Sequence, residues 1–464
     1  MMKKELVSLC LAGLALTSAA RNNTRHPNII LIVADDLGWG DVGYHGSEIR
    51  TPNIDAFVND GIELDRYYVS PISSPTRAGL MTGRYPNRFG FRESVLPPWR
   101  KGGLPLEEET FADMLGRCGY KNRAMIGKWH LGHSCKAYHP LERGFTHFHG
   151  LLNGAFDYFT HKREGEIDWH DDWDTCREEG YSTDLIGSEA VRCIEEYSQT
   201  APYFLYVAFN APHTPYQAPE EEIAKYLPLD QFRKLGKKDQ DGWIYRAMVS
   251  RMDTNIGRIL FALDKSGQAD NTIVLFMSDN GGVPGMEPYS RCLPLKGHKF
   301  DEWEGGVRVP AAIRWPEGFI SKSQPLNQVI SFVDILPTVA DILDADAPAR
   351  PYDGISMYPV LSGKRKRIDR ILYLGLGAAV GQNFKLIIPT KNKGLRLKEE
   401  YFTNIIKDPC ERSDGKLKGH NRQRTRLRKV IKQYDSIKPA MPEQPYGKGK
   451  KGFRAPKEWD ITTL

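Results

Sequence analysis

The segment Asn28-Ile29-Ile30-Leu31-Ile32-Val33-Ala34, followed directly by Asp35-Asp36, decides the fold class. An unbroken apolar run of this length is typical of a parallel strand that is buried on both faces. Three further runs are similarly apolar, at 123–127, 203–209 and 272–277. Helical stretches are expected between and after them, at 110–118, 182–197, 245–264 and 332–343. Strands that alternate with helices predict an α/β fold with a doubly wound sheet.

The chain has 464 residues, of which 40% are hydrophobic and 26% charged. This composition excludes a disordered chain, a coiled coil and a collagen-like repeat. The length predicts two or three domains, or one large core with an appendage. We expect a catalytic domain over residues 21–363 and a small C-terminal domain over 364–464, with short strands at 371–376 and 384–388. From Pro439 the chain is rich in Pro, Gly and Lys, which predicts an extended or mobile tail.

The net charge of +6 hides an asymmetry along the chain. Residues 364–464 carry 26 Lys or Arg and 10 Asp or Glu, whereas the rest of the chain is acidic. A basic domain on an acidic body indicates a polyanionic partner, such as nucleic acid, anionic lipid or a sulfated glycan. The alternative is a basic surface that is only solvated.

The N-terminal residues predict export. Lys3 and Lys4 precede an apolar run over 6–16, and Thr17-Ser18-Ala19-Ala20 follows, so residues 1–20 have the pattern of a signal peptide cleaved after Ala20. The run is too short to span a bilayer, and no stable membrane insertion is expected. Apart from Cys10, six cysteines remain without CxxC spacing, which is typical of structural thiols or disulfides.

Reactive side chains follow each of the four expected strands. In order along the chain they are Asp35 and Asp36, Lys128 and His130, Asn210 and His213, and Asp279 and Asn280. Ligands of open α/β sheets bind beyond the C-terminal ends of the strands. A single Asp after a strand is also typical of a helix N-cap. Four such ends on one rim instead predict a functional site.

The residue types at these strand ends indicate the chemistry. Three carboxylates and one amide are hard oxygen donors, which suit Ca²⁺ or Mg²⁺ better than zinc. Adjacent Asp side chains that point together would repel each other without a cation. Lys128 and a second lysine would form an anion pocket, and His130 and His213 could act as general acid and base. This set predicts hydrolysis of a phosphate or sulfate ester.

A candidate nucleophile lies in Ser73-Ser74-Pro75-Thr76-Arg77, which opens a segment that ends in Thr82-Gly83-Arg84. Pro75 suits the first turn of a helix and Gly83 suits its end. Ser73 is expected just before this helix, where free N–H groups attract an anion. The alternative is an ordinary serine N-cap.

This segment resembles the sulfatase signature: Cys or Ser, any residue, Pro, any residue and Arg, with a Thr-Gly-Arg close. Six further segments resemble the family's motifs, in the expected order: 35–41, 51–55, 127–132, 211–213, 278–282 and 299–310. The chain therefore resembles type I, formylglycine-dependent sulfatases of the arylsulfatase or N-acetylgalactosamine-4-sulfatase kind. The resemblance implies an alkaline-phosphatase-like mixed sheet with a smaller C-terminal α+β domain.

The resemblance also implies a cofactor and a set of site residues. A maturation enzyme would oxidise Ser73 to Cα-formylglycine; one hydroxyl of its hydrate attacks sulfur, and the other is needed to expel sulfate. One Ca²⁺, rather than Mg²⁺, would be held by Asp35, Asp36, Ser73, Asp279 and Asn280. The catalytic residues would be Ser73, Arg77, Lys128, His130, His213 and Lys299.

Each of these catalytic side chains has a role implied by the resemblance. Arg77 would steady the hydrate, and Lys128 and Lys299 would bind the sulfate oxygens and stabilise developing charge. His213 would protonate the leaving alcohol, and His130 would assist release of sulfate.

The family's Ser form goes with bacterial hosts and oxygen-independent maturation, which implies a periplasmic or secreted protein. Residues 150–161 resemble a stretch shared by arylsulfatases and N-acetylgalactosamine-4-sulfatases, where a sugar could be contacted; a structural loop is the alternative. The basic domain favours a sulfated carbohydrate of the glycosaminoglycan or mucin type, and no nucleic acid partner is expected. Residues 401–409 depart from the Leu-Tyr-Asp-Leu turn common in such families.

Two other functions compete with a sulfatase. One is a phosphodiesterase or phosphonate hydrolase of the wider alkaline-phosphatase superfamily, although those sites usually hold two metals and the sequence shows ligands for one. The other is an inactive glycan-binding homologue in which Ser73 stays unmodified. The presence of Arg77, both histidines and both lysines favours catalysis.

Overall fold

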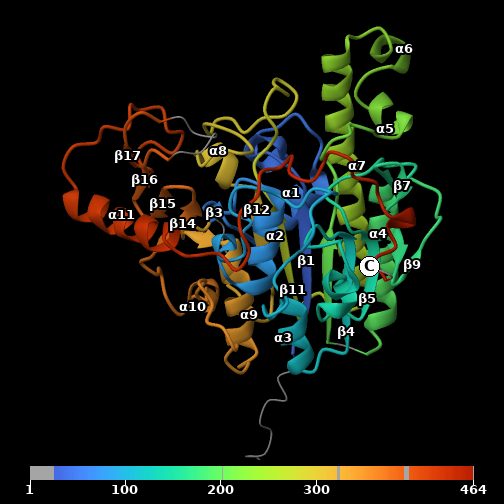
Figure 1. Ribbon diagram of the computed structural model, residues 1–464, viewed down its shortest axis with the longest axis horizontal. Helices are drawn as coiled ribbons and strands as arrows, with labels where there is room; N and C mark the ends of the chain where they lie inside the picture. Colours follow the sequence, from blue (N-terminus) through green and yellow to red (C-terminus); the bar gives the residue numbers. More distant parts are fainter. Residues whose placement is uncertain (1–25, 201, 321–323, 391–396, 463–464) are drawn as a thin grey trace, which may run out of the picture.

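The computed structural model describes residues 26–200, 202–320, 324–390 and 397–462. The expected signal peptide and Cys10 lie outside these ranges. A large mixed sheet forms the centre of the molecule (Figure 1). Its strands lie in the order β2 (Ile62–Glu63), β12 (Ala311–Arg314), β11 (Thr272–Ser278), β1 (Asn28–Ala34), β10 (Tyr203–Ala208), β4 (Asn122–Lys128), β5 (His147–Leu151), β8 (His170–Asp171) and β9 (Asp174–Thr175).

The four strands expected from apolar runs are adjacent in this sheet. β11, β1, β10, β4 and β5 run parallel, and the flanking strands are antiparallel. Leu31 at the middle of β1 lies opposite Tyr206 of β10 and Leu275 of β11. The C-terminal ends of these parallel strands therefore meet at one edge of the sheet.

Helices cover both faces of the sheet, as the alternation of strands and helices predicts. Ile29 and Leu31 of β1 face one apolar core, and Ile30 and Ile32 face the other. The first core is covered by α2 (Ser73–Thr82), α3 (Phe111–Arg117) and α9 (Ile335–Ile342). The second is covered by α1 (Pro52–Asp60), α4 (Ser182–Tyr197) and α7 (Lys237–Lys265). The sheet is thus doubly wound, and burial on both faces explains why its strands are continuously apolar.

Helix α7 is longer than the sequence predicts, because it begins at Lys237 rather than at Tyr245. The added turns are polar and project from the body beside α5 (Glu220–Ala224) and α6 (Leu229–Phe232) (Figure 1). Lys237 Nζ lies 2.6 Å from Asp241 Oδ1, an i,i+4 pair of the kind that supports an exposed helix. Apolar periodicity detects only the part of the helix that packs on the sheet.

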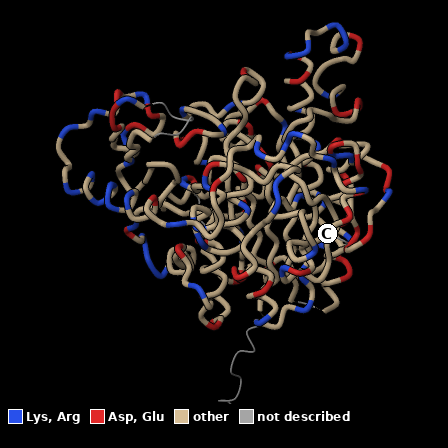
Figure 2. The backbone as a smooth tube through the Cα atoms, viewed as in Figure 1, with Lys and Arg blue, Asp and Glu red and all other residues tan. Residues whose placement is uncertain are grey.

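The C-terminal part contains a separate antiparallel sheet of β14 (Ile371–Gly375), β15 (Ala378–Gly381), β16 (Phe384–Ile387) and β17 (Tyr401–Asn404). Helix α11 (Asn421–Asp435) packs on it through Leu427 and Ile431. Figure 2 shows Lys and Arg gathered along α11 and the chain beside it. Arg424 and Arg428 of α11 both pair with Glu400, so part of this positive charge is neutralised.

The remaining elements are short. They are β3 (Tyr67–Tyr68) paired with β13 (Ile330–Ser331), β6 (Lys162–Arg163) paired with β7 (Glu166–Ile167), α8 (Glu304–Val307), α10 (Tyr358–Leu361), and the 3-10 turns 39–41, 43–45, 86–88, 136–138, 140–142, 332–334 and 457–459. The helix expected over 332–343 therefore divides into a 3-10 turn and α9.

A buried ion cluster joins the small sheet to the large domain. Lys385 of β16 has its Nζ 2.9 Å from Glu304 Oε1 in α8 and 3.0 Å from Glu411 Oε1. None of the three side chains is exposed to solvent. Because an unpaired charge in such a place is costly, the cluster fixes how the two sheets dock.

The last residues are extended, as expected, but they pack against the large domain instead of lying free. They run from the C-terminal domain across the body to β7 and β9 (Figure 1). Ala440 N donates to Arg88 O at 2.7 Å, and Trp459 Nε1 donates to Arg163 O at 3.0 Å. Trp459 and Ile461 are only 1% and 2% exposed. Burial of these apolar side chains opposes the mobility suggested by the Pro- and Gly-rich composition. We call residues 440–462 the C-terminal strap.

The cysteines at 118, 135, 176, 193, 292 and 410 are free thiols in the described part of the chain. Over the same residues, no helix has the length and apolar character needed to cross a membrane.

Candidate active site

The edge formed by the parallel strands carries a cluster of buried oxygen donors. Asp35 and Asp36 follow β1, and Asp279 and Asn280 follow the adjacent β11. Asp36 N donates to Asp279 Oδ1 at 3.3 Å, and Asn280 Nδ2 donates to Asp36 Oδ1 at 2.6 Å. All four side chains are at most 1% exposed. The structure thus brings together the four residues that the sequence singled out as metal ligands.

Ser73 is the first residue of α2, not the residue before it, and Ile72 takes the N-cap position. The serine therefore does not cap the helix; its Oγ lies 3.3 Å from Asp35 Oδ1 and 3.1 Å from Asn280 Oδ1. Its position at the helix N-terminus still favours a bound anion, because the first N–H groups lack intrahelical partners. Ser73 therefore lies both in the first turn of α2 and in contact with the oxygen cluster.

Arg77 lies one turn further along α2 and is fully buried. Its Nε and Nη2 donate to Asp279 Oδ2 at 3.0 and 2.8 Å, and its Nη1 donates to Lys128 O at 3.0 Å. Burial would lower the pKa of the guanidinium, but Asp279 raises it above its usual range. Its contacts are with the cluster and the end of β4, so the geometry gives Arg77 a positioning role.

Two lysines balance the carboxylates. Lys128 Nζ forms a buried ion pair with Asp35, and Lys299 Nζ lies 2.7 Å from Asp36 Oδ1. Burial lowers the pKa of Lys128, whereas Asp36 raises the pKa of Lys299 against the opposing effect of burial. Burial and the nearby Asp279 raise the pKa of Asp35 to about 7. Cations and carboxylates are therefore interleaved in one water-poor cluster.

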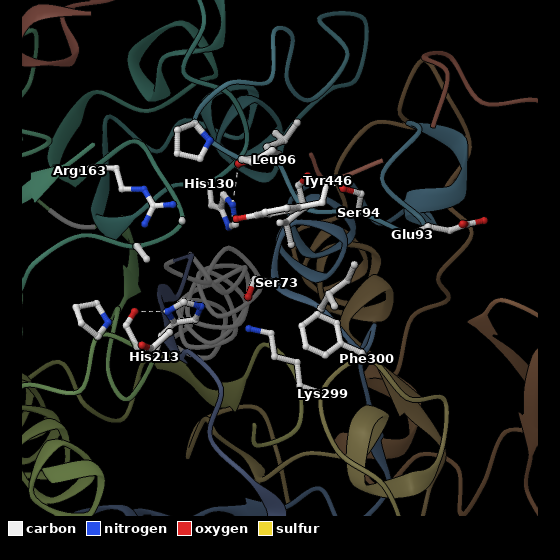
Figure 3. A pocket seen from close by; sticks show the side chains of 18 residues that line it. Ser73, Glu93, Ser94, Leu96, His130, Arg163, His213, Lys299, Phe300 and Tyr446 are labelled. Atoms are coloured by element: carbon white, nitrogen blue, oxygen red, sulfur yellow. Dashed lines mark hydrogen bonds between the residues drawn. The ribbon is translucent and has the colours of Figure 1, made fainter. Parts of the chain in front are cut away.

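The two histidines lie on either side of Ser73 (Figure 3). His213 Nε2 lies 3.6 Å from Asp36 Oδ2, and His130 Nε2 lies 3.1 Å from Leu96 O. Burial lowers the pKa of His213 to about 3, and burial with the charge of Lys128 lowers that of His130 well below its usual value. Burial thus favours the neutral form of both rings. Asn210, also at a strand end, instead donates to Ser182 Oγ at 3.2 Å.

Two of these residues have left-handed backbones, with φ of 69° at Asp36 and 57° at His130. Residues other than glycine rarely adopt this conformation, and it is often retained at functional sites. Gly154 packs against His130 so closely that a Cβ at position 154 would lie 2.4 Å from the ring atoms Cε1 and Nε2. Only glycine leaves space for the ring at this position.

A cavity of about 550 Å³ opens over the cluster. Ser73, His130, His213 and Lys299 line it (Figure 3), whereas Arg77 and Lys128 are not among its lining residues. Apolar walls are contributed by Val95, Leu96, Pro97, Pro98, Phe300 and Tyr446. Gly154 and Ala155 also line it, so the segment singled out at 150–161 reaches the cavity.

Arg163 and Tyr446 complete the cavity wall, and the sequence did not single out either residue. Arg163 lies on the two-residue strand β6, and Tyr446 lies in the C-terminal strap. Neither segment has an apolar period or a recognisable motif that would have indicated a role.

The donor set fits a hard divalent cation. Asp35, Asp36, Asp279, Asn280 and Ser73 present carboxylate, amide and hydroxyl oxygens, and ligand atoms of Asp35, Asp36 and His213 lie within 4.8 Å of one another. Oxygen donors select Ca²⁺ or Mg²⁺, whereas zinc prefers nitrogen and sulfur. A cation would also relieve the repulsion that raises the pKa of Asp35.

Known proteins resemble this chain over most of its length. The model of the sulfatase family matches residues 27–345. Arylsulfatase J of Mus musculus is 34% identical over 349 residues, which cover 72% of this chain and 56% of that protein. N-acetylgalactosamine-6-sulfatase of Homo sapiens is 32% identical, covering 77% of this chain and 70% of that protein.

A solved structure, of Ps i-CgsB in complex with k-i-k-neocarrahexaose, is 31% identical with a TM-score of 0.79, covering 92% of this chain and 96% of that one. The arrangement of the sheet and of the small C-terminal sheet is thus that of known sulfatases. The match over residues 27–345, and the position of Ser73 among the oxygen donors, establish that the chain belongs to the sulfatase family.

Proposed function

We propose that the protein hydrolyses sulfate monoesters of a sulfated carbohydrate, through a formylglycine made from Ser73 and with one Ca²⁺ in the oxygen cluster. One observation carries this proposal: Ser73 lies at the N-terminus of α2 within hydrogen-bond distance of two prospective metal ligands and on the floor of an open cavity. The cation would supply positive charge, and the hydrate of the aldehyde would supply an activated hydroxyl nucleophile at position 73.

The other cavity residues fit the handling of a sulfate ester. Lys299 reaches the floor of the cavity from the side of Asp36 and can bind a sulfate oxygen. His213 lines the cavity with its Nδ1 fixed 2.6 Å from Thr214 O, which leaves Nε2 for the leaving alcohol. The negative charge of bound sulfate favours protonation of this ring, which burial otherwise opposes. We assign His213 as the acid and His130 as the group that assists release of sulfate.

Lys128 and Arg77 do not line the cavity, and they act through the carboxylates with which they pair. Lys128 neutralises Asp35, and Arg77 ties Asp279 to the end of β4. Both charges lie close to the place where sulfate would be held, in a site shielded from water, where electrostatic stabilisation is strongest. The resemblance gave these two residues direct contacts with sulfate and with the hydrate; the contacts seen here support electrostatic and positioning roles.

The substrate class is proposed from the relatives and the charge. A protein 31% identical to this chain has been solved in complex with k-i-k-neocarrahexaose, and a 32% identical one is an N-acetylgalactosamine-6-sulfatase. The excess of Lys and Arg after residue 364 favours a polyanionic chain over a small aryl sulfate. We further propose bacterial export by the signal peptide at 1–20, periplasmic or secreted action, and an oxygen-independent maturation enzyme as partner.

The alternatives have weaker support. A phosphodiesterase or phosphonate hydrolase would usually need a second metal, and the described residues around Ser73 form one oxygen cluster. An inactive glycan-binding protein would not need Lys299, His130 and His213 to face Ser73 across one cavity.

Co-expression with a maturation enzyme, followed by assay on defined sulfated mono- and disaccharides, tests the proposal. Formylglycine formation removes two hydrogens, so the peptide containing residue 73 should become about 2 Da lighter. Ser73→Ala should abolish turnover without changing the melting temperature appreciably. Lys299→Ala should strongly reduce turnover. Lys296→Ala, on the same loop but stacked on Trp303, is the matched control. Full activity of protein carrying only unmodified Ser73 would contradict the proposal.

A further inference from the structure

Arg163 presents a positive charge to the cavity that is only loosely paired within the protein. Figure 3 shows its side chain on the cavity wall, on the side away from Phe300. Among the described residues its Nε has no hydrogen-bond partner although the atom is buried, and its ion pair is a long one, 3.7 Å to Oε1 of the exposed Glu164 side chain. A guanidinium offers five donors in a planar fork that matches carboxylate and sulfate groups. A buried N–H donor without a hydrogen bond costs free energy, which a bound anion would recover.

The C-terminal strap holds Arg163 in place. Trp459, 1% exposed, donates from Nε1 to Arg163 O at 3.0 Å. The adjacent Glu458 N donates to Glu166 Oε2 at 2.9 Å, and the Glu458 side chain pairs with Arg177. The β6–β7 hairpin that carries the arginine is thus anchored by residues far along the chain, so its guanidinium is presented from a fixed backbone.

The same strap supplies an aromatic wall for a sugar. Trp99 Nε1 donates to Tyr446 O at 2.6 Å, and the two rings pack edge to face with centroids 5.2 Å apart. Tyr446 therefore offers an apolar surface and a hydroxyl beside Pro97 and Pro98. A ring placed against this wall with its sulfate at Ser73 would have a neighbouring substituent near Arg163.

We propose that Arg163 binds a second anionic group of the substrate, so that the enzyme selects sugars that carry another sulfate or a uronate carboxylate beside the scissile sulfate. The inference rests on the proposed sulfatase activity and makes its substrate class more specific. Arg163 lies apart from the oxygen cluster, so it acts on substrate choice and leaves the chemistry at residue 73 unchanged.

The test compares Arg163→Ala with the wild type on three substrates: a neutral monosulfated sugar, its disulfated analogue, and a monosulfated sugar linked to a uronate. A lost charge-assisted contact should lower kcat/KM by about 10- to 100-fold on the substrate that uses it, mainly through KM. Turnover of the neutral monosulfated sugar should stay within about twofold. The substrate that is affected identifies sulfate or carboxylate as the second anion. Lys162→Ala, the exposed neighbour on β6, is the matched control.

An equal loss on all three substrates, or no loss on any, would overturn the inference while leaving the sulfatase function intact. Calorimetric binding of the same saccharides to unmatured protein, with and without Arg163→Ala, decides the matter even where no turnover occurs. Trp459→Phe keeps the ring but removes the N–H that holds Arg163 O. It should raise KM for the doubly anionic substrate and leave kcat unchanged, whereas a purely structural role would lower thermal stability and affect every substrate alike.

Discussion

Arg77 donates from both Nε and Nη2 to a single oxygen of Asp279, at 3.0 and 2.8 Å, and neither side chain is exposed to solvent. This pair links the helix that begins with Ser73 to the end of the strand that supplies two oxygen donors. The position of Ser73 relative to the cluster therefore depends on an ion pair that does not reach the cavity.

Removal of the Arg77 side chain should destabilise the protein and inactivate it. Arg77→Ala leaves Asp279 charged and buried without the guanidinium that pairs with it, which should lower the free energy of unfolding by about 3–5 kcal/mol. Arg92→Ala removes a partly exposed guanidinium that pairs with Asp435 and should cost less than about 1 kcal/mol. Urea unfolding of both variants measures the difference. Similar losses would show that burial of the Arg77 pair does not matter.

Loss of an oxygen donor should remove metal and activity together. Asp279→Ala and chelation should each abolish turnover, and Ca²⁺ should restore the chelated wild type. Asp253→Asn alters another buried carboxylate, one that binds the backbone at Asn53 and Ile54, and should keep the metal. Elemental analysis of the wild type and of both variants measures the bound metal. Stoichiometric zinc without calcium or magnesium would refute the assignment.

A methyl group at position 154 should displace His130. In Gly154→Ala the new Cβ would lie 2.4 Å from the imidazole ring, so either the ring or the loop must move. A shift of about 1 Å in a catalytic group can cost about 100-fold in rate. We expect kcat to fall on every sulfated substrate with little loss of stability. Gly236→Ala has nothing within 4 Å of its Cβ and should behave as wild type; unchanged kcat in Gly154→Ala would argue against this role of the glycine.

The stability contributed by His147 should disappear at high pH. Burial would lower its pKa, but hydrogen bonds to Asp172 and Glu189 raise it to about 9. Because the folded pKa exceeds the unfolded value of 6.5, the stabilisation is complete below pH 6.5 and is lost as pH rises through 9. His147→Gln should cost about 1–2 kcal/mol at pH 6, reduced by partial exposure, and almost nothing at pH 10. Denaturant unfolding at the two pH values checks the sign; a loss that grows with pH would contradict it.

The basic C-terminal domain should matter for long substrates only. Neutralising Lys364, Arg365, Lys366 and Arg367, all exposed, should raise KM for a sulfated polymer and leave a monosaccharide unaffected. Added salt should do the same, because screening weakens long-range attraction. These residues are better targets than Arg424 and Arg428, whose charges are engaged by Glu400. Kinetics across a salt series test the idea, and an equal salt response of both substrates would leave the basic surface without this role.

The parts of the fold that could be predicted are those with a regular pattern of apolar residues along the sequence. The apolar runs gave the strands nearly to the residue, because burial on both faces leaves no room for polar alternation. The polar first turns of α7 were missed, since they face solvent and carry no apolar stripe. Ser73 was misplaced by one position because a serine before Pro75 looks like an N-cap, whereas its hydroxyl instead contacts the oxygen cluster.

The residues of the oxygen cluster could be predicted from the sequence, whereas Arg163 and Tyr446 of the cavity wall could not. The cluster residues follow strands that end at one edge, so position along the chain indicates position in space. Arg163 and Tyr446 reach the cavity only through tertiary contacts of a two-residue strand and an aperiodic strap. The contact between Trp459 and Arg163 joins segments that no local pattern relates.

The C-terminal strap has a consequence for how substrate preference diverges among relatives. The family model ends at residue 345, but Tyr446 and Trp459 lie beyond it. Two proteins could therefore agree at every residue of the matched region and still differ in the wall that faces the sugar. Substitutions in the strap can alter that wall without touching the helix of Ser73 or the carboxylates. Part of the cavity wall is therefore encoded in a separate stretch of the gene from the residues of the oxygen cluster, and that part can change while the cluster is kept.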